Sequence, residues 1–335
     1  MSKRAIFSAV KSIPERKMRR NTINRKIMKS FNEFLISKKK YFTRIIILFP
    51  KAIKSILLNT FLRSMKLLII GDIHYPREPG IFIKLLNLIE ETSPDILAIC
   101  GDIINFANKH WLRKFFRKIH RRKKNLKVVA VMGNHDFWLS KSAMRRGMTS
   151  WDLVDVYSET FEEFGDFLLW DSPFMEEVEI VGVPGWYDYS FAPWHLGFKK
   201  KDFDRGVIDN WIWNDVVYTK FNMSNEEVLK ENLKHLEKQL TLAHSNKVIV
   251  LLHFVPLRDF VRFTNDRFKD FWTAYYGSDK LAVPIIQSNK VKYVFFGHIS
   301  IKHLLSKRVF KNGILFESVD ISDDISNHVI LDIPA

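Results

Sequence analysis

The sequence predicts an α/β fold with a mainly parallel central sheet. Short, unbroken apolar runs, typical of strands buried on both faces, recur along the chain. Helical patterns separate the early runs, and the order β-α-β-α-β implies parallel strands joined by right-handed crossovers. Asp, Asn or His follows five of the runs at the same end, where open α/β sheets place their ligands. These runs are 67–70, 96–100, 128–132, 248–252 and 291–296.

Amphipathic patterns predict helices between these strands. Pro94 ends the first helix, because the residue before a proline disfavours the helical conformation. Ser224 begins the strongest helix, and Glu227 follows three residues later, as in a capping box. We expect helices over 80–91, 108–120, most of 137–164 and 224–243.

The C-terminal part of the chain predicts short antiparallel strands. Asn312-Gly313 lies between two of them, and this dipeptide favours the two-residue turn of a hairpin. The expected strands are 307–310, 313–317 and 328–333, with 167–170 and 178–183 earlier in the chain.

Residues 184–222 interrupt the alternation of strands and helices. They hold four of the nine tryptophans, with charged residues between them, and the segment is long for a loop without structure. One interpretation is an insertion that shapes a substrate pocket, with Trp186, Tyr187 and Asp188 as candidate walls. The other interpretation is an aromatic satellite core.

The length of 335 residues allows one large domain and a smaller part, which we place at 65–335 and 1–64. Cys100 is the one cysteine, which excludes an internal disulfide and fits a reducing, cytoplasmic location. Because Cys100 lies inside an apolar run, we expect a buried, inert thiol.

The net charge of +16 is concentrated in residues 1–64. This segment holds 17 Lys and Arg against 2 acidic residues, a net of 17 − 2 = +15. The remainder holds 36 basic and 35 acidic residues, a net of +1. The body therefore offers no electrostatic track for a duplex, and no specific nucleic-acid partner is indicated.

Residues 1–64 predict basic amphipathic helices, with apolar residues at helical spacing among lysines and arginines. Such helices bind anionic membrane surfaces or acidic partners, which would make the protein peripheral at a membrane. Two alternatives stay open, a structural extension of the domain and a translation start at Met65. No apolar run approaches the roughly 20 residues that a membrane span needs.

The polar residues that follow the strands predict a metal site. They mix carboxylate, amide and imidazole groups without a thiolate, which suits manganese, our first expectation, or iron, zinc or magnesium. Because Asp72 and His74 are two apart in an extended segment, they should face one point. Six ligands fit two divalent ions that share a bridging carboxylate better than one ion. The six are Asp72, His74, Asp102, Asn134, His253 and His298.

In order and spacing, these motifs resemble those of the calcineurin-like metallophosphoesterases. The resemblance covers about residues 66–333 and implies a four-layer α/β/β/α sandwich with two mixed central sheets. It rests on Asp72-Ile73-His74, Gly101-Asp102, Gly133-Asn134-His135-Asp136, His253 and Gly297-His298.

The same resemblance implies a role for each residue. His135 would not be a ligand but would stabilise the phosphate and protonate the leaving oxygen. Asp136 would orient His135. Asp72 and His74 would hold the first metal, Asp102 would bridge both metals, and Asn134, His253 and His298 would hold the second.

Two positions depart from the patterns of the family. Many members have Gly-His-x-His in the last motif, where Ser300 stands at the final position here. The first metal would then have fewer side-chain ligands or would use His303. The Ser/Thr protein phosphatase branch has Asp-Arg after its bridging carboxylate, and Asn105-Phe106 at this place argues against that branch.

We therefore expect a dinuclear metal-dependent phosphoesterase that hydrolyses a phosphate mono- or diester. The expected reaction is in-line attack by metal-activated hydroxide, with His135 as general acid. Alternatives with the same fold are a nuclease and a nucleotide or lipid-headgroup pyrophosphatase. An alternative from another class is a non-catalytic scaffold that binds a membrane or a partner through the basic arm.

Overall fold

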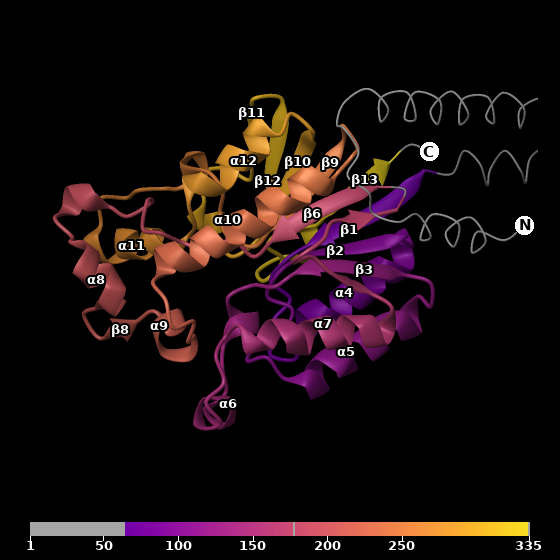
Figure 1. Cartoon of the computed structure of the whole chain (residues 1–335), viewed down its shortest axis with the longest axis horizontal. Helices are drawn as coiled ribbons and strands as arrows, with labels where there is room; N and C mark the ends of the chain where they lie inside the picture. The colour runs from indigo at the N-terminus through magenta and orange to yellow at the C-terminus, as the bar shows by residue number, and fades with distance from the viewer. Residues whose placement is uncertain (1–63, 177, 334–335) are drawn as a thin grey trace, which may run out of the picture. The chain divides into compact units, whose positions relative to one another are not determined.

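The computed structural model describes residues 64–176 and 178–333, and two mixed sheets form its centre (Figure 1). The five-stranded sheet has the order β13-β1-β2-β3-β4, and the six-stranded sheet has the order β11-β12-β10-β9-β6-β5. Helices cover the outer faces of the sheets. The predicted α/β/β/α sandwich is confirmed. The helical extension predicted for the N-terminal arm lies outside the described residues, which begin at Ser64.

The five-stranded sheet is parallel except at one edge. β1 pairs in parallel with β2, β2 with β3, and β3 with β4, as the strand–helix alternation predicted. β13 comes from the end of the chain and pairs antiparallel with β1. The strands are β1 (Met65–Ile70), β2 (Ile96–Cys100), β3 (Lys127–Val131), β4 (Phe167–Leu168) and β13 (Val329–Ile333).

The six-stranded sheet has a parallel centre and antiparallel edges. The predicted hairpin is confirmed, because Lys311 pairs with Ile314 and both residues between them have positive φ, Asn312 at 53° and Gly313 at 75°. The strands are β5 (Phe174–Met175), β6 (Glu179–Val183), β9 (Val248–Leu252), β10 (Val291–Phe296), β11 (Arg308–Lys311) and β12 (Ile314–Ser318).

Helices pack on both sheets. α4, α5 and α7 lie together along the five-stranded sheet, and α10 lies along β6 of the other sheet (Figure 1). Among the described residues, no helix is long and apolar enough to cross a membrane. The helices of these two layers are α4 (Pro79–Thr92), α5 (Lys109–Arg122), α7 (Asp152–Phe164), α10 (Asn225–Leu242) and α12 (Ala282–Gln287).

Two helix predictions had different outcomes. The capping box of α10 is confirmed, since Ser224 Oγ accepts the N–H of Glu227 and the Glu227 carboxylate accepts the N–H of Ser224. The helix expected over most of 137–164 is interrupted. A short helix, α6 (Lys141–Arg145), ends in a turn with Gly147 at φ 76°, and α7 starts afresh at Asp152.

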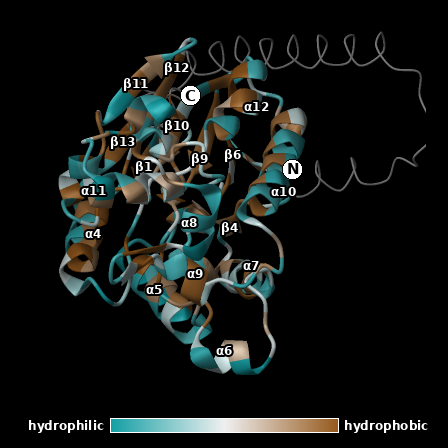
Figure 2. Cartoon of the chain, turned by 90° about the vertical axis from the view of Figure 1, so that its left-hand side faces the viewer, coloured by the Kyte–Doolittle hydropathy of each residue, from teal (hydrophilic) through white to brown (hydrophobic). Residues whose placement is uncertain are grey.

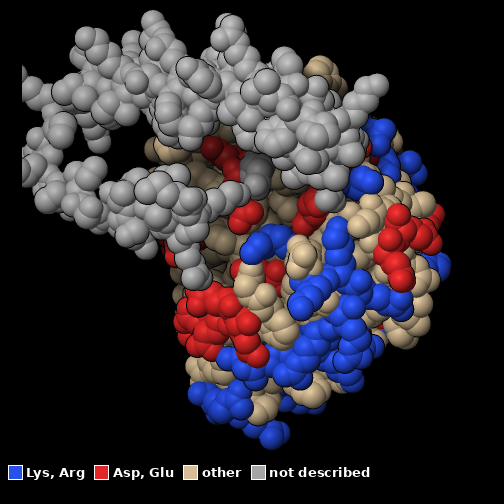
Figure 3. Space-filling model, turned by 90° about the vertical axis from the view of Figure 1, so that its right-hand side faces the viewer, with Lys and Arg blue, Asp and Glu red and all other residues tan. Residues whose placement is uncertain are grey.

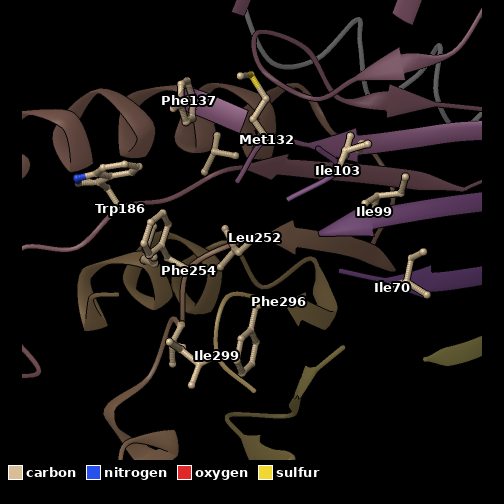
Figure 4. Close-up of a cluster of buried hydrophobic side chains, with 14 of the residues drawn as sticks. Ile70, Ile99, Ile103, Met132, Phe137, Trp186, Leu252, Phe254, Phe296 and Ile299 are labelled. Atoms are coloured by element: carbon tan, nitrogen blue, oxygen red, sulfur yellow. The ribbon is translucent and has the colours of Figure 1, made fainter. Parts of the chain in front are cut away.

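Apolar side chains that alternate along the strands fill the space between the two sheets. Leu67 and Ile69 of β1 belong to this inter-sheet core together with Ile249 and Leu251 of β9. The opposite faces of the strands pack under the helices. Figure 4 shows the carboxyl ends of strands from both sheets, where buried residues precede the polar turns; these include Ile70, Ile99, Leu252 and Phe296.

Residues 184–222 fold beyond the carboxyl ends of the strands, at the left of Figure 1. The segment contains α8 (Lys200–Arg205), the hairpin of β7 (Val207–Ile208) and β8 (Trp211–Ile212), and α9 (Asn214–Tyr218), and α11 (Arg267–Phe271) lies near it. Its aromatic side chains form a satellite core, with Trp186, Tyr187, Tyr189, Phe191 and Phe203 fully buried.

Removing the hydroxyl of Ser224 will lower the free energy of unfolding. Ser224→Ala deletes the acceptor for the N–H of Glu227, and loss of such a cap costs about 1 kcal/mol. Urea unfolding followed by circular dichroism measures the change. The control is Thr241→Ala in the last turn of α10, for which we expect less than about 0.5 kcal/mol. Equal effects of the two substitutions would contradict the capping role.

Candidate metal centre

The turns after β1, β2 and β10 hold four of the predicted ligands in the left-handed backbone conformation. Asp72, His74, Asp102 and His298 have φ values of 61°, 48°, 54° and 74°. Non-glycine residues adopt this conformation rarely, and such strain is concentrated at functional sites. We expected Asp72 and His74 to face one point because they would lie in an extended segment, and this reason is wrong. The backbone at both residues forms a turn, and the turn orients their side chains.

The carboxylate of Asp102 is the centre of the site. Its Oδ1 lies 3.5 Å from Nε2 of His253. Its Oδ2 lies 3.6 Å from Nε2 of His74 and 3.8 Å from Nε2 of His135. Oδ1 also accepts the backbone N–H of His135 at 2.9 Å. One carboxylate thus faces imidazoles from both of its oxygens.

Hydrogen bonds on the outer side of His253 and Asn134 turn their ligand atoms inward. Nδ1 of His253 donates to the carbonyl of Cys100 at 2.8 Å, which leaves Nε2 free, 2.9 Å from Oδ1 of Asn134. Nδ2 of Asn134 donates to Asp215 at 2.8 Å and so fixes which end of the amide faces the site. Such outer partners orient metal ligands and tune their basicity.

Asp72 and His298 are joined through the backbone. Both oxygens of Asp72 lie 3.0 Å from the backbone nitrogen of His298, which donates to them. Nε2 of His298 donates to the carbonyl of Tyr275 at 3.0 Å and leaves Nδ1 as the free ligand atom. The ring of His298 lies beside that of His253, with centroids 4.9 Å apart.

Four of the six predicted ligands fall in two groups that share Asp102. The ligand atoms of Asp72, Asp102 and His253 lie within 4.8 Å of one another. The same holds for His74, Asp102 and His135, so the structure also brings the predicted general acid to the ligand cluster.

Asn105 connects two of the histidines, although the sequence marked it only as a departure from one branch of the family. Its Oδ1 lies 3.1 Å from Nδ1 of His74 and 2.5 Å from Nδ1 of His135. A carbonyl acceptor there places the proton on Nδ1 of each ring and leaves each Nε2 to face Asp102. His135 also stacks on Trp138, with ring centroids 3.5 Å apart.

The prediction that Asp136 orients His135 is wrong. Asp136 is fully buried, and its carboxylate holds together the two loops that follow β2 and β3. The side chain of His135 is held by Asn105 instead. The four donors to Asp136 are the backbone N–H groups of Ile103, Ile104 and Gly133 and the hydroxyl of Tyr157.

Asp215 is a positioning residue that the sequence did not single out. It is fully buried, and it accepts from Nδ2 of Asn134 and from Nε1 of Trp138 and Trp213, at 2.8, 2.7 and 2.9 Å. The hydroxyl of Tyr187 is a further partner. Asp215 thereby couples the 184–222 segment to a predicted metal ligand. Its sequence signal, an acidic residue shortly after two tryptophans, was too general to identify it.

The three predicted pocket walls do not line the site. Trp186 and Tyr187 are 0% and 1% exposed, so they offer a substrate no surface, and the prediction is wrong for them. Asp188 pairs with Lys280 at 2.9 Å and accepts the N–H of Ser190, which ties its carboxylate to a local turn. The aromatic segment contributes other residues to the site, foremost Asp215 and Trp213.

The electrostatics of the site fit divalent cations. Burial, with the charge of Asp320, raises the pKa of Asp72, and burial, with the charge of Asp136, raises the pKa of Asp102. In the part of the chain that the structure describes, no lysine or arginine forms an ion pair with either carboxylate. Burial lowers the pKa of His74 to about 4, and the neutral imidazole is the form that binds metals. The donors fit the two ions implied by the motifs.

Ser300 is turned away from the ligand cluster. Its Oγ donates to Asp323, and His303 belongs to neither ligand group found among the described residues. A buried acid, Asp320, lies beside Gly71 at the end of β1, and burial raises its pKa to about 6. Like the predicted ligands, Asp320 follows a strand closely, and that is the signal by which it could have been found.

Two glycines let the turns approach the carboxylates. A Cβ on Gly133 would lie 2.2 Å from Oδ1 of Asp102, and one on Gly297 would lie 2.1 Å from Oδ2 of Asp72. Any larger residue would displace a ligand oxygen. Glycine in the Gly-Asn-His and Gly-His motifs is therefore required by close approach to a ligand.

Together, the sandwich and the strand-end cluster of carboxylates, imidazoles and an amide define a class of α/β metal-binding proteins. Residues 65–301, more than half of the chain, match the family described as calcineurin-like phosphoesterase. The chain belongs to the calcineurin-like phosphoesterase family. No functionally curated protein matches the sequence.

Solved structures of low sequence identity are similar to this chain. A dimetal phosphatase from Danio rerio shows 12% identity and a TM-score of 0.46, with 80% of this chain and 92% of that chain covered. TT1561 of Thermus thermophilus shows 13% identity and a TM-score of 0.43, with 80% and 99% covered. An archaeal phosphodiesterase shows 12% identity and a TM-score of 0.33, with 81% and 100% covered.

Asp215→Asn will weaken metal binding. An amide cannot accept from all the donors that meet at Asp215, so Asn134 loses its fixed orientation. We expect a loss of about 10–100-fold in the affinity for Mn²⁺, measured by isothermal titration calorimetry. Asp209→Asn, at an exposed position of the same segment, should bind as the unaltered protein does. An unchanged affinity for Asp215→Asn would contradict its positioning role.

Removal of divalent metal will lower the melting temperature. Ions that bind only the folded state stabilise it by about 2.7 kcal/mol at a free concentration of 100 times Kd. Thermal unfolding with excess Mn²⁺ and with EDTA measures the difference. Asp102→Asn should lose most of this response, because it removes the charge at the centre of the cluster. A response that persists undiminished in this variant would place the bound ion elsewhere.

Proposed function

We propose that this chain is a dinuclear metal-dependent phosphoesterase that hydrolyses a phosphate mono- or diester. The observation that carries the proposal is the Asp102 carboxylate, whose two oxygens face histidines on different sides. Bound divalent ions, with Mn²⁺ as the first candidate, would supply Lewis-acid activation of water and of the phosphoryl oxygens. Family membership supports a hydrolase of this kind.

The proposed ligand roles are those that the resemblance to the family implies. The shared carboxylate is Asp102, and the other proposed ligands form two groups. Oxygen and nitrogen donors of this kind suit Mn²⁺, Fe, Zn²⁺ or Mg²⁺. The first group is Asp72 and His74, and the second is Asn134, His253 and His298.

His135 is the proposed general acid. Its Nδ1 donates to Asn105, so Nε2 is the atom that faces the centre and would carry the proton to the leaving oxygen. Burial and the neighbouring histidines lower the pKa of His135. The negative charge of a phosphate ester bound beside the ring acts in the opposite direction and favours the protonated form.

A nuclease is the less favoured alternative within this fold. Figure 3 shows Lys and Arg gathered on the right-hand face of the molecule, whereas the candidate site lies at the carboxyl ends of the strands, on the left of Figure 1. Arg121 and Arg122 at the end of α5 and Lys124 in the turn before β3 are exposed. A duplex held by these charges would not be directed to the metal centre.

A non-catalytic scaffold is the alternative from another class. The convergence of all six predicted ligands and the support given to them by Asn105 and Asp215 favour an enzyme, because a scaffold has no need of them. We propose in addition that residues 1–64 bind an anionic surface or an acidic partner, on the basis of their sequence charge.

Substitution of His135 will distinguish the role of general acid from that of metal ligand. We expect His135→Ala to lower kcat by about 100–10,000-fold on a phosphate ester with an alkyl leaving group. The loss on p-nitrophenyl phosphate should be smaller, since that leaving group departs without a proton. Steady-state rates of both esters with Mn²⁺ measure the difference.

The controls for this experiment are His110→Ala and Asp102→Asn. His110 is exposed on α5, so its removal should not change either rate. Asp102→Asn should abolish both rates together, because it removes the shared carboxylate. Equal losses of His135→Ala on the two esters would contradict the acid role. Absence of hydrolysis of any phosphate ester by the unaltered protein with each metal would overturn the proposed function.

A further inference from the structure

A cavity of about 240 Å³ opens beside His135, and tryptophan dominates its walls. Trp138, Trp211, Trp213 and Trp272 contribute, together with Ile212. The cavity therefore begins at the proposed general acid and continues under the β7–β8 hairpin and the start of α9. If a phosphate ester binds at the candidate metal centre, a group attached to the phosphate on the side of His135 will contact these rings.

Several polar groups that line this cavity already have hydrogen-bond partners. Nε1 of Trp138 and Nε1 of Trp213 both donate to Asp215. Only the carbon atoms of these two indoles are therefore available to contact a ligand. Asp215 is saturated by its donors, and Asn134 is held by Asp215. A nucleobase is read through hydrogen bonds to its edges, which these groups cannot supply. The cavity suits an apolar group better than a base.

The mouth of the cavity continues into exposed apolar side chains, which we name the apolar rim: Val207, Trp211, Ile212, Val216, Val217 and Phe268. The described part of the chain has fifteen exposed large hydrophobic residues, and six of them belong to the apolar rim. Exposed hydrophobic side chains are therefore concentrated at the rim. Trp211 is 64% exposed, which is a high value for tryptophan in a folded protein. Figure 2 turns this face to the viewer and shows hydrophobic residues on α9.

Contacts join the rim to the cavity. Val207 lies opposite Ile212 in the β7–β8 hairpin. The ring of Phe268 lies 6.4 Å from Trp211 and 5.9 Å from Trp272, so ring contacts lead from the rim to the cavity wall. Apolar surface that is contiguous and exposed marks a binding site for an apolar partner.

We propose that the substrate is an amphiphile, a phosphate ester that carries a long alkyl or acyl chain. This inference rests on the proposed phosphoesterase function. The phosphate would lie at the metal centre beside His135, and the chain would cross the tryptophan-lined cavity and leave over the apolar rim. The rim would then lie at the surface of the bilayer or micelle that holds the substrate.

The test is the dependence of hydrolysis on chain length. A series of p-nitrophenyl alkyl phosphates with about 1–8 carbons, used with Mn²⁺ below micelle-forming concentrations, keeps the reacting groups constant. Each methylene buried in the cavity should raise kcat/KM about threefold. The double substitution of Trp211→Ser and Ile212→Ser should lower the ratio of kcat/KM for the longest and shortest chains about tenfold. The double substitution of Leu305→Ser and Phe310→Ser removes equally exposed apolar groups elsewhere and should leave that ratio unchanged.

A second measurement needs no turnover and separates the two proposals. Brominated alkyl phosphonates, which are not hydrolysed, should quench tryptophan fluorescence, with an affinity that rises with chain length. If this binding is seen but no ester is hydrolysed, the amphiphile site stands and the proposed catalysis fails. If esters are hydrolysed without dependence on chain length, or a nucleoside ester is preferred to every alkyl ester, the amphiphile is overturned and the catalysis stands. An affinity for the phosphonates that does not vary with chain length would also overturn the amphiphile.

Discussion

The burial of the Asp102 carboxylate between imidazoles is the constraint on which the rest of the site depends. Its two oxygens face His253 on one side and His74 and His135 on the other. A carboxylate with little exposure and no lysine or arginine partner among the described residues is costly, because burial disfavours its charge. Divalent cations would compensate this cost. The turns that carry the predicted ligands have a strained backbone, which is also typical of a functional site.

The imidazoles and the amide are oriented by partners outside the centre, and these partners are of two kinds. Backbone carbonyls of Cys100 and Tyr275 hold His253 and His298. Side chains hold the remainder, with Asn105 for His74 and His135 and Asp215 for Asn134. Because each outer atom is fixed, the free ligand atom of each ring is fixed as well. The centre is therefore preorganised by groups that would not touch a metal.

The aromatic segment 184–222 contributes to the site in two ways. Its inner part is a buried core, and Asp215 with its indole and phenol donors connects that core to the predicted metal ligand Asn134. Its outer part, from β7 to α9, provides the exposed side chains and the cavity wall beside His135. A change in the packing of this segment would thus alter both the orientation of a ligand and the shape of the substrate side.

The sequence by itself determined the alternation of strands and helices, the α10 cap, the hairpin at Asn312-Gly313 and the polar residues that follow the strands. These are local signals, since burial on both faces, capping and turn chemistry act within a few residues. Only the tertiary structure decided what Asp136, Asp215 and Trp186 do. Asn134 and Asp215 are 81 residues apart in the chain, and Asp136 meets its backbone donors across two loops. Such roles depend on which groups the packing of distant segments leaves in contact, and no local pattern encodes that.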